Sequence, residues 1–125
     1  MKAVVLIFLQ CLISLLTFAK TWHVGEKHVI KKIKEGIAVA QNGDTVLVEK
    51  GFYKEGNIVI DKSICFLGRN LPIIDGDRKF EVLSIKVNNV RVEGFKIQHS
   101  GYATLDDPGG IKVYDSERVN IINNL

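Results

Sequence analysis

Hydrophobic and polar residues alternate over short segments along most of this chain, and one such segment recurs at a regular distance. Residues 63–68 and 89–94 align without gaps 26 positions apart, and residues 118–123 follow 29 positions after the second segment. Each segment places two apolar side chains on one strand face before a Gly or Asn turn residue. Short alternating strands with a period in the twenties are typical of a stacked β-solenoid. The aligned positions, which we expect to form inward-facing rows, are Ile64, Phe66, Val90, Val92, Val119 and Ile121.

The same alternation predicts short strands from residue 44 onward, with an aromatic-bearing turn at residues 50–53. The expected strands are residues 44–49, 57–60, 62–67, 71–76, 81–87, 90–97, 110–114 and 119–122. The 82 residues from 44 to 125 make about three coils, the smallest number expected to give a stable repeat array. The pattern stops in mid-repeat, so we expect residues 44–125 to be the truncated start of a longer solenoid.

Residues 26–41 have a different periodicity, which predicts one amphipathic helix. Its apolar positions recur at helical spacing, with lysines on the opposite face, and Asn42-Gly43 supplies a stop signal. The apolar positions are Val29, Ile30, Ile33, Ile37 and Ala40. A helix at this point would cover the open apolar end of the first coil, so residues 20–43 are expected to form an N-terminal cap. The predicted fold is therefore an all-β, right-handed parallel β-helix with an N-terminal capping α-helix.

Residues 1–19 have the pattern of a secretory signal peptide. Lys2 precedes an uncharged run of 16 residues, and Thr17-Phe18-Ala19 places small residues before a cleavage site after Ala19. The run is short for a bilayer-spanning helix, which needs roughly 20 apolar residues. We therefore expect an exported protein with no membrane span after cleavage.

Charge and cysteine content narrow the remaining function classes. Removal of residues 1–19 leaves 16 Lys and Arg (17 minus Lys2) against 14 Asp and Glu, a net charge of only +2. The basic residues are scattered apart from the lysines on the predicted helix, so the sequence does not indicate nucleic-acid binding. Cys65 is the one cysteine left after cleavage, which excludes an intrachain disulfide in the expected mature chain.

Several segments together resemble the opening of the NosD family of β-helix proteins. The matching segments, which cover nearly all of residues 25–125, are residues 43–48, 51–53, 58–64, 67–68, 72–76, 98–101, 107 and 109–113. The resemblance implies a periplasmic accessory protein for the maturation of nitrous-oxide reductase, working with an ABC transporter in copper-centre assembly. Copper and both partners are implied by the resemblance alone. The alternative is a carbohydrate-binding or carbohydrate-cleaving β-helix of the lyase or hydrolase type, because exported proteins of that class share the first elements.

The residues themselves present no catalytic constellation and no evident cofactor site. Copper prefers Cys, Met and His ligands, and the expected mature chain offers Cys65, His23, His28 and His99, with no pair at a recognised ligand spacing. His99 is the best single metal candidate because it leaves a strand and enters the long loop 98–110. Asp75 and Asp77 flank Gly76 and are interpreted as turn formers.

The loop 98–110 is longer than a turn requires, and loops held on a rigid scaffold often carry function. Its candidate partner-contact residues are His99, Tyr102, Asp106 and Asp107. We therefore expect a non-enzymatic role that is centred on this loop.

Overall fold

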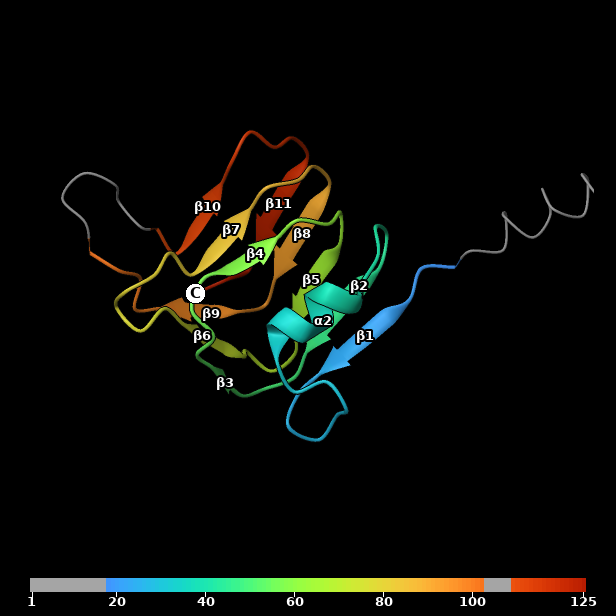
Figure 1. Cartoon of the computed structure of the whole chain (residues 1–125), viewed down its shortest axis with the longest axis horizontal. Coiled ribbons are helices and arrows are strands. Elements are labelled where there is room, and N and C mark those ends of the chain that lie inside the picture. Colours follow the sequence, from blue (N-terminus) through green and yellow to red (C-terminus); the bar gives the residue numbers. More distant parts are fainter. Residues whose placement is uncertain (1–17, 103–108) are drawn as a thin grey trace, which may run out of the picture.

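The computed structural model describes residues 18–102 and 109–125 as three parallel β-sheets with one short helix (Figure 1). The first sheet has the order β1-β2-β5-β8-β11 and contains Thr21–Val24, Thr45–Val48, Cys65–Gly68, Val90–Glu93 and Val119–Ile122. The second has the order β4-β7-β10 and contains Ile58–Ile60, Leu83–Ile85 and Ile111–Val113. The third has the order β3-β6-β9 and contains Phe52–Tyr53, Ile73–Asp75 and Lys96–Gln98. The predicted all-β class is confirmed.

From β2 onward the chain visits the sheets in a fixed order: first, third, second, then the first again. Each strand therefore pairs in parallel with the strand three places later in the chain. In the first sheet Phe66 lies opposite Val92, and Val90 lies opposite Val119. These registers confirm the alignment predicted from the repeated segments.

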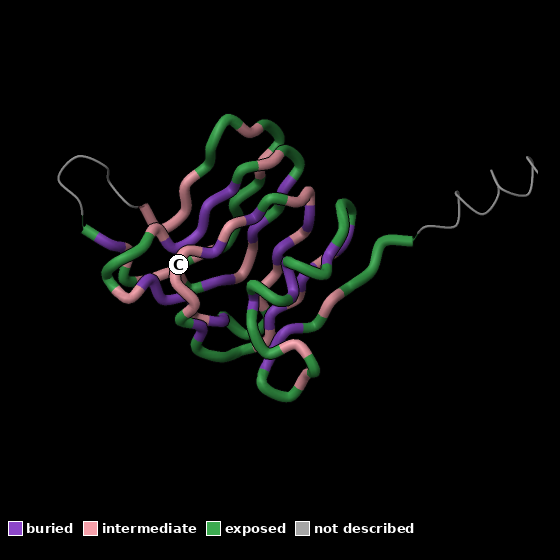
Figure 2. Tube along the Cα trace, in the orientation of Figure 1, coloured by how far each residue is buried: buried purple, intermediate pink, exposed green. Residues whose placement is uncertain are grey.

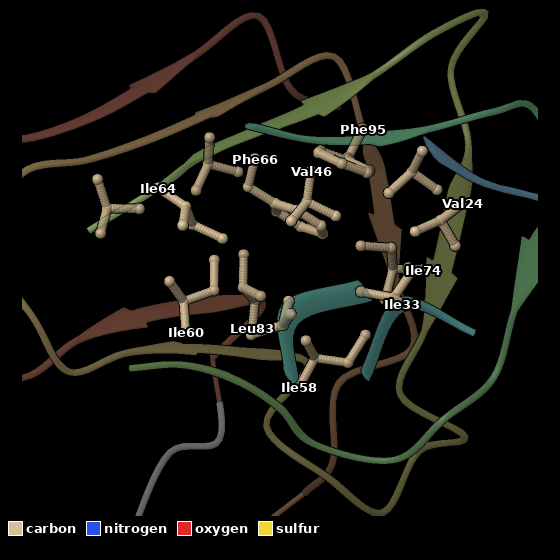
Figure 3. Close-up of a cluster of buried hydrophobic side chains, with 14 of the residues drawn as sticks. Val24, Ile33, Val46, Ile58, Ile60, Ile64, Phe66, Ile74, Leu83 and Phe95 are labelled. Carbon is tan, nitrogen blue, oxygen red and sulfur yellow. The ribbon is translucent and has the colours of Figure 1, made fainter. Parts of the chain in front are cut away.

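The core lies between the three sheets and consists of apolar side chains that the strands and the helix direct inward (Figure 3). Ile64, Phe66, Val90 and Val92 are all buried, as the inward rows predict. Phe66 stacks on Phe95 with the ring centroids 4.3 Å apart. Burial decreases toward β11, the edge strand of the first sheet, where Val119 is half-buried and Ile121 is 44% exposed (Figure 2).

The predicted helix over residues 26–41 is wrong in its first half. Helix α2 spans only Ile33–Val39, and Val29, expected on the apolar face, is 99% exposed. Ile30 instead forms a parallel bridge with Val24, and its carbonyl accepts the Gly25 N–H at 3.0 Å. Pairing with the end of β1 fixes residues 25–30 as a loop, because an extended Ile30 cannot belong to a helix.

Helix α2 packs against β1, β2 and β4 and buries Ile33 and Ile37 in the core. Its two ends are bound by side chains from later in the sequence. The Glu55 carboxylate accepts the Ile33 and Lys34 N–H groups at 2.8 and 3.0 Å, and the Lys62 ammonium donates to the last carbonyls at 2.7 and 2.8 Å. Both charges oppose the helix dipole, which stabilises a helix that is too short to form alone.

Strand β1 precedes the helix and was not predicted from the sequence. It pairs with β2, and the Trp22 indole N–H donates to the Asp44 carboxylate at 3.0 Å. Residues 1–17, which contain most of the expected signal peptide, lie outside the described residues. Among residues 18–102 and 109–125 no helix is both long and apolar enough to cross a bilayer.

Candidate functional site

The predicted site residue His99 lies at the end of two paired strands. Asp75 is the last residue of β6, and its neighbour across the strand pair is Gln98, the last residue of β9. His99 follows directly and has a left-handed backbone conformation with φ of 55°. Its Nδ1 lies 2.6 Å from Asp75 Oδ2, so strand pairing brings together two residues that are 24 positions apart.

Asp75 forms a turn, as the sequence indicated, because its carboxylate accepts the Asp77 N–H two residues on. It is also a buried anion, which the sequence did not indicate. It is 3% exposed, and its carboxylate accepts hydrogen bonds from Gln98 Nε2 at 2.8 Å, the Asp77 N–H at 2.7 Å and His99 Nδ1. Burial raises the pKa of Asp75, but these hydrogen bonds to the charged form outweigh it and hold the pKa at about 2. Asp75 is therefore ionised at neutral pH.

The ionised Asp75 carboxylate determines which nitrogen of the His99 ring carries the hydrogen. A carboxylate only accepts, so His99 Nδ1 carries a hydrogen, and the lone pair of the neutral ring is on Nε2. The His99 side chain is 43% exposed. A carboxylate that orients a histidine in this way is the usual partner of a metal-binding imidazole or of a histidine general base.

Charged groups from two other loops surround this pair. Lys54, between β3 and β4, lies 2.9 Å from Asp77, and Lys79 lies 3.8 Å from the other oxygen of Asp77. The hydrogen bond and the charge of Lys54 lower the pKa of Asp77, and those of Asp77 raise the pKa of Lys54. The Asp77 carboxylate, two residues after Asp75, is therefore neutralised by two ammonium groups, and Lys54 also interacts with the Asp75 charge.

The structure describes only the first part of the predicted loop. The Gly101 N–H donates to the Phe80 carbonyl at 3.0 Å, and Tyr102 is 84% exposed. Asp106 and Asp107 lie outside the described residues, so their proximity to His99 stays a prediction.

The other candidate ligands lie on different elements. Cys65 is a half-buried free cysteine on β5. His23, on β1, and His28, in the loop before α2, stack with ring centroids 5.3 Å apart, although no ligand spacing joins them in the sequence. Within residues 18–102 and 109–125 Cys65 does not belong to any group of three or more potential metal ligands.

Sequence reasoning missed Asp75, although the sequence held a signal for it. The separation of 24 residues between Asp75 and His99 is close to the repeat period. In a stack of coils, a polar residue at the end of one strand lies next to the residue that follows it by about one repeat period in the sequence.

No family model, curated protein or solved structure matches this chain.

Proposed function

We propose that the three parallel sheets are the faces of a right-handed parallel β-helix. Support comes from the fixed order in which the chain visits the sheets and from the parallel pairing of each strand with the strand three places later. Connections between parallel strands of one sheet are right-handed in about 98% of cases, which favours this hand. An experimental structure with the opposite hand would contradict the proposal.

We further propose that the chain is an exported accessory protein of the NosD type, which assists copper-centre assembly in nitrous-oxide reductase together with an ABC transporter. The proposed location is the periplasm, on the basis of the signal-peptide pattern of residues 1–19. The observation that carries the function is the His99–Asp75 pair, because the buried carboxylate directs a half-exposed imidazole outward at the base of the loop 98–110. Imidazole is a suitable copper ligand. In this role copper is the ion that the protein transfers to the reductase, and not its own cofactor.

A single imidazole suits delivery better than storage. Among the described residues His99 belongs to no group of three potential ligands, so we propose that a partner supplies further ligands to a copper ion bound there. Shared ligands allow the ion to be passed on when the partner leaves.

A complementation experiment tests this function. The chromosomal gene is replaced by a His99→Ala, Tyr102→Ala variant in a host that makes the copper-dependent reductase, and the copper content and activity of the purified reductase are measured. We expect both to fall several-fold, whereas Asn120→Ala, an exposed position on β11, should leave them unchanged. A folded double variant that supports full copper loading would exclude this role for the loop.

The His99–Asp75 pair also supports the carbohydrate alternative, in which His99 acts as a general base and not as a metal ligand. His99 held by Asp75 has the arrangement of a general base, and the nearby ammonium groups of Lys54 and Lys79 suit an acidic sugar. Asp75, with a pKa of about 2, cannot supply the protonated acid that a glycoside hydrolase needs, so a lyase is the more suitable enzyme. Incubation with polyuronates, followed by ultraviolet detection of unsaturated products, tests it.

A further inference from the structure

We propose that His23, His28 and Glu49 form a binding site for a divalent first-row transition ion, for which Zn²⁺ is the probe. One nitrogen from each ring and one carboxylate oxygen all lie within 4.8 Å of one another. It is the single group of three or more such side chains among residues 18–102 and 109–125. The site is independent of the function proposed above, because neither His99 nor Asp75 takes part in it.

Strand pairing places two of the three ligands on the same face. His23 on β1 lies opposite Leu47 on β2, and the Glu49 N–H, directly after β2, donates to the Val24 carbonyl at 2.8 Å. Val24 and Val48 point into the core. Because successive strand residues alternate between faces, His23 and Glu49 point to the outer face.

A glycine makes room for the third ligand. A Cβ added to Gly25 would lie 3.1 Å from Glu49 Cβ and 3.3 Å from His28 Cδ2, closer than ordinary packing allows. The His28 N–H donates to the Gly25 carbonyl at 3.1 Å, which turns the chain back toward β2. The close approach of His28 to Glu49 therefore depends on the missing side chain of residue 25.

The loop that carries His28 is held by the protein and not by a metal. The Val24–Ile30 bridge closes its base, and the Lys31 ammonium donates to the carbonyls of Glu26 and His28 at 2.6 and 3.3 Å. A preformed loop lowers the entropy cost of binding an ion.

The separations suit an ion after a small movement of the side chains. With Zn–N and Zn–O bonds of about 2.0–2.2 Å, tetrahedral ligand atoms lie about 3.4 Å apart. His28 Nε2 already lies 3.9 Å from Glu49 Oε1, and His23 is exposed and able to rotate. Two imidazoles and one carboxylate are the donors that Zn²⁺ accepts when it keeps an open fourth position.

The surrounding charges limit the affinity. Arg69 lies 3.0 Å from Glu49 Oε1, the same oxygen that faces His28, so the guanidinium orients the carboxylate but also competes with the ion for this atom. His28 and Glu49 also line a hollow of about 240 Å³ together with Glu26, Lys27 and Lys50, and this hollow has room for an exchangeable ligand. The positive side chains repel a cation, so we expect micromolar rather than nanomolar binding.

Calorimetric titration of the untagged, full chain with Zn²⁺ tests the site. We expect one equivalent to bind, and Mg²⁺, which prefers all-oxygen ligands, not to compete. His23→Ala and His28→Ala should each weaken binding by at least about tenfold, since even the loss of a group that only supports a ligand costs 10- to 100-fold. Asn120→Ala, an exposed position on β11, is the control, with no expected change.

Gly25→Ala tests the geometry without removing a ligand. The added methyl group would require Glu49 and His28 to shift by a few tenths of an ångström, so we expect this variant to bind more weakly while it keeps its circular dichroism spectrum. Unchanged Zn²⁺ affinity in His23→Ala and His28→Ala, or equal loss in Asn120→Ala, would overturn the proposal. Because the readout is direct binding, its failure would leave the reductase experiment unaffected.

Discussion

Gly68 and Gly94 approach so closely that neither position has room for a side chain. A Cβ added to Gly68 would lie 2.5 Å from the Gly94 carbonyl oxygen, and one added to Gly94 would lie 2.5 Å from the Gly68 carbonyl oxygen. The two glycines are 26 residues apart and hold the same position of the repeat, Gly68 as the last residue of β5 and Gly94 directly after β8. The repeated glycine of the sequence pattern therefore marks a close backbone contact between neighbouring strands as well as a turn.

Gly68→Ala should destabilise the fold, because the contact is with backbone atoms and with Pro72, which cannot move cheaply. We expect a loss of about 2–3 kcal/mol in the free energy of unfolding, measured by urea denaturation. Gly109→Ala is the control, since among residues 18–102 and 109–125 a Cβ there would meet the Ile111 carbonyl oxygen alone, at an ordinary contact distance of 3.6 Å. Equal stability of the two variants would contradict the packing described here.

Val92 and Ile121 occupy the same slot of the repeat but differ in burial. They are paired in register, yet Val92 is fully buried whereas Ile121 is 44% exposed. Val92→Asp would bury an unpaired charge and should cost about 4 kcal/mol or more, whereas Ile121→Asp should cost about 1 kcal/mol. Chemical denaturation compares the two, and similar losses would show that β11 is as well covered as β8.

The Asp75 carboxylate should make stability depend on pH in the acid range. Its pKa is about 2 in the folded protein, below the ordinary value of 3.8, so the folded state binds fewer protons than the unfolded state. The stabilisation is therefore complete above about pH 4 and is lost as the pH falls toward 2. Urea midpoints measured across this range should fall more steeply for the natural chain than for Asp75→Asn.

Asp115→Asn is the control for this pH dependence, because Asp115 lies exposed in the turn before β11. It should reproduce the acid slope of the natural chain. Parallel slopes for the natural chain and Asp75→Asn would show that the buried carboxylate does not respond to pH in this way.

Cleavage after Ala19 should itself stabilise the protein. The Lys20 backbone nitrogen lies 2.9 Å from Asp44 Oδ1, so a chain that begins at Lys20 would place its α-ammonium group on this carboxylate. Backbone hydrogen bonds from Gln41 and Lys20 and the Trp22 indole already lower the pKa of Asp44, which keeps it charged. A charge-assisted hydrogen bond is stronger than a neutral one.

Mass spectrometry of the exported protein should therefore find Lys20 as the first residue, and this form should melt at a higher temperature than the uncleaved chain. Asp44→Asn should remove the difference between the two forms. Exported material that retains Met1 would contradict the cleavage.

The alternation of apolar residues predicted the pairing of β5, β8 and β11 and most of the other strands. It did not predict β3 within the expected turn at residues 50–53, and it joined β8 and β9 into one strand over residues 90–97. Strand periodicity is local, and equal segments one period apart must align when coils stack, so Phe66 opposite Val92 followed from the sequence alone. The loop at residues 25–30 did not follow, because its apolar residues fit helical spacing. Only the bridge between Val24 and Ile30, a long-range contact, selects the extended form.

The polar sites were decided by tertiary structure because the number of residues per coil varies. Paired residues are 20 positions apart between β2 and β5, 26 between β5 and β8, and 23 between β6 and β9. These differences come from turns whose lengths have no period, so the sequence did not predict that Asp75 would reach His99 or that Glu49 would join His23 and His28. A local pattern fixes which face a side chain occupies, whereas the folded turns decide which side chains meet.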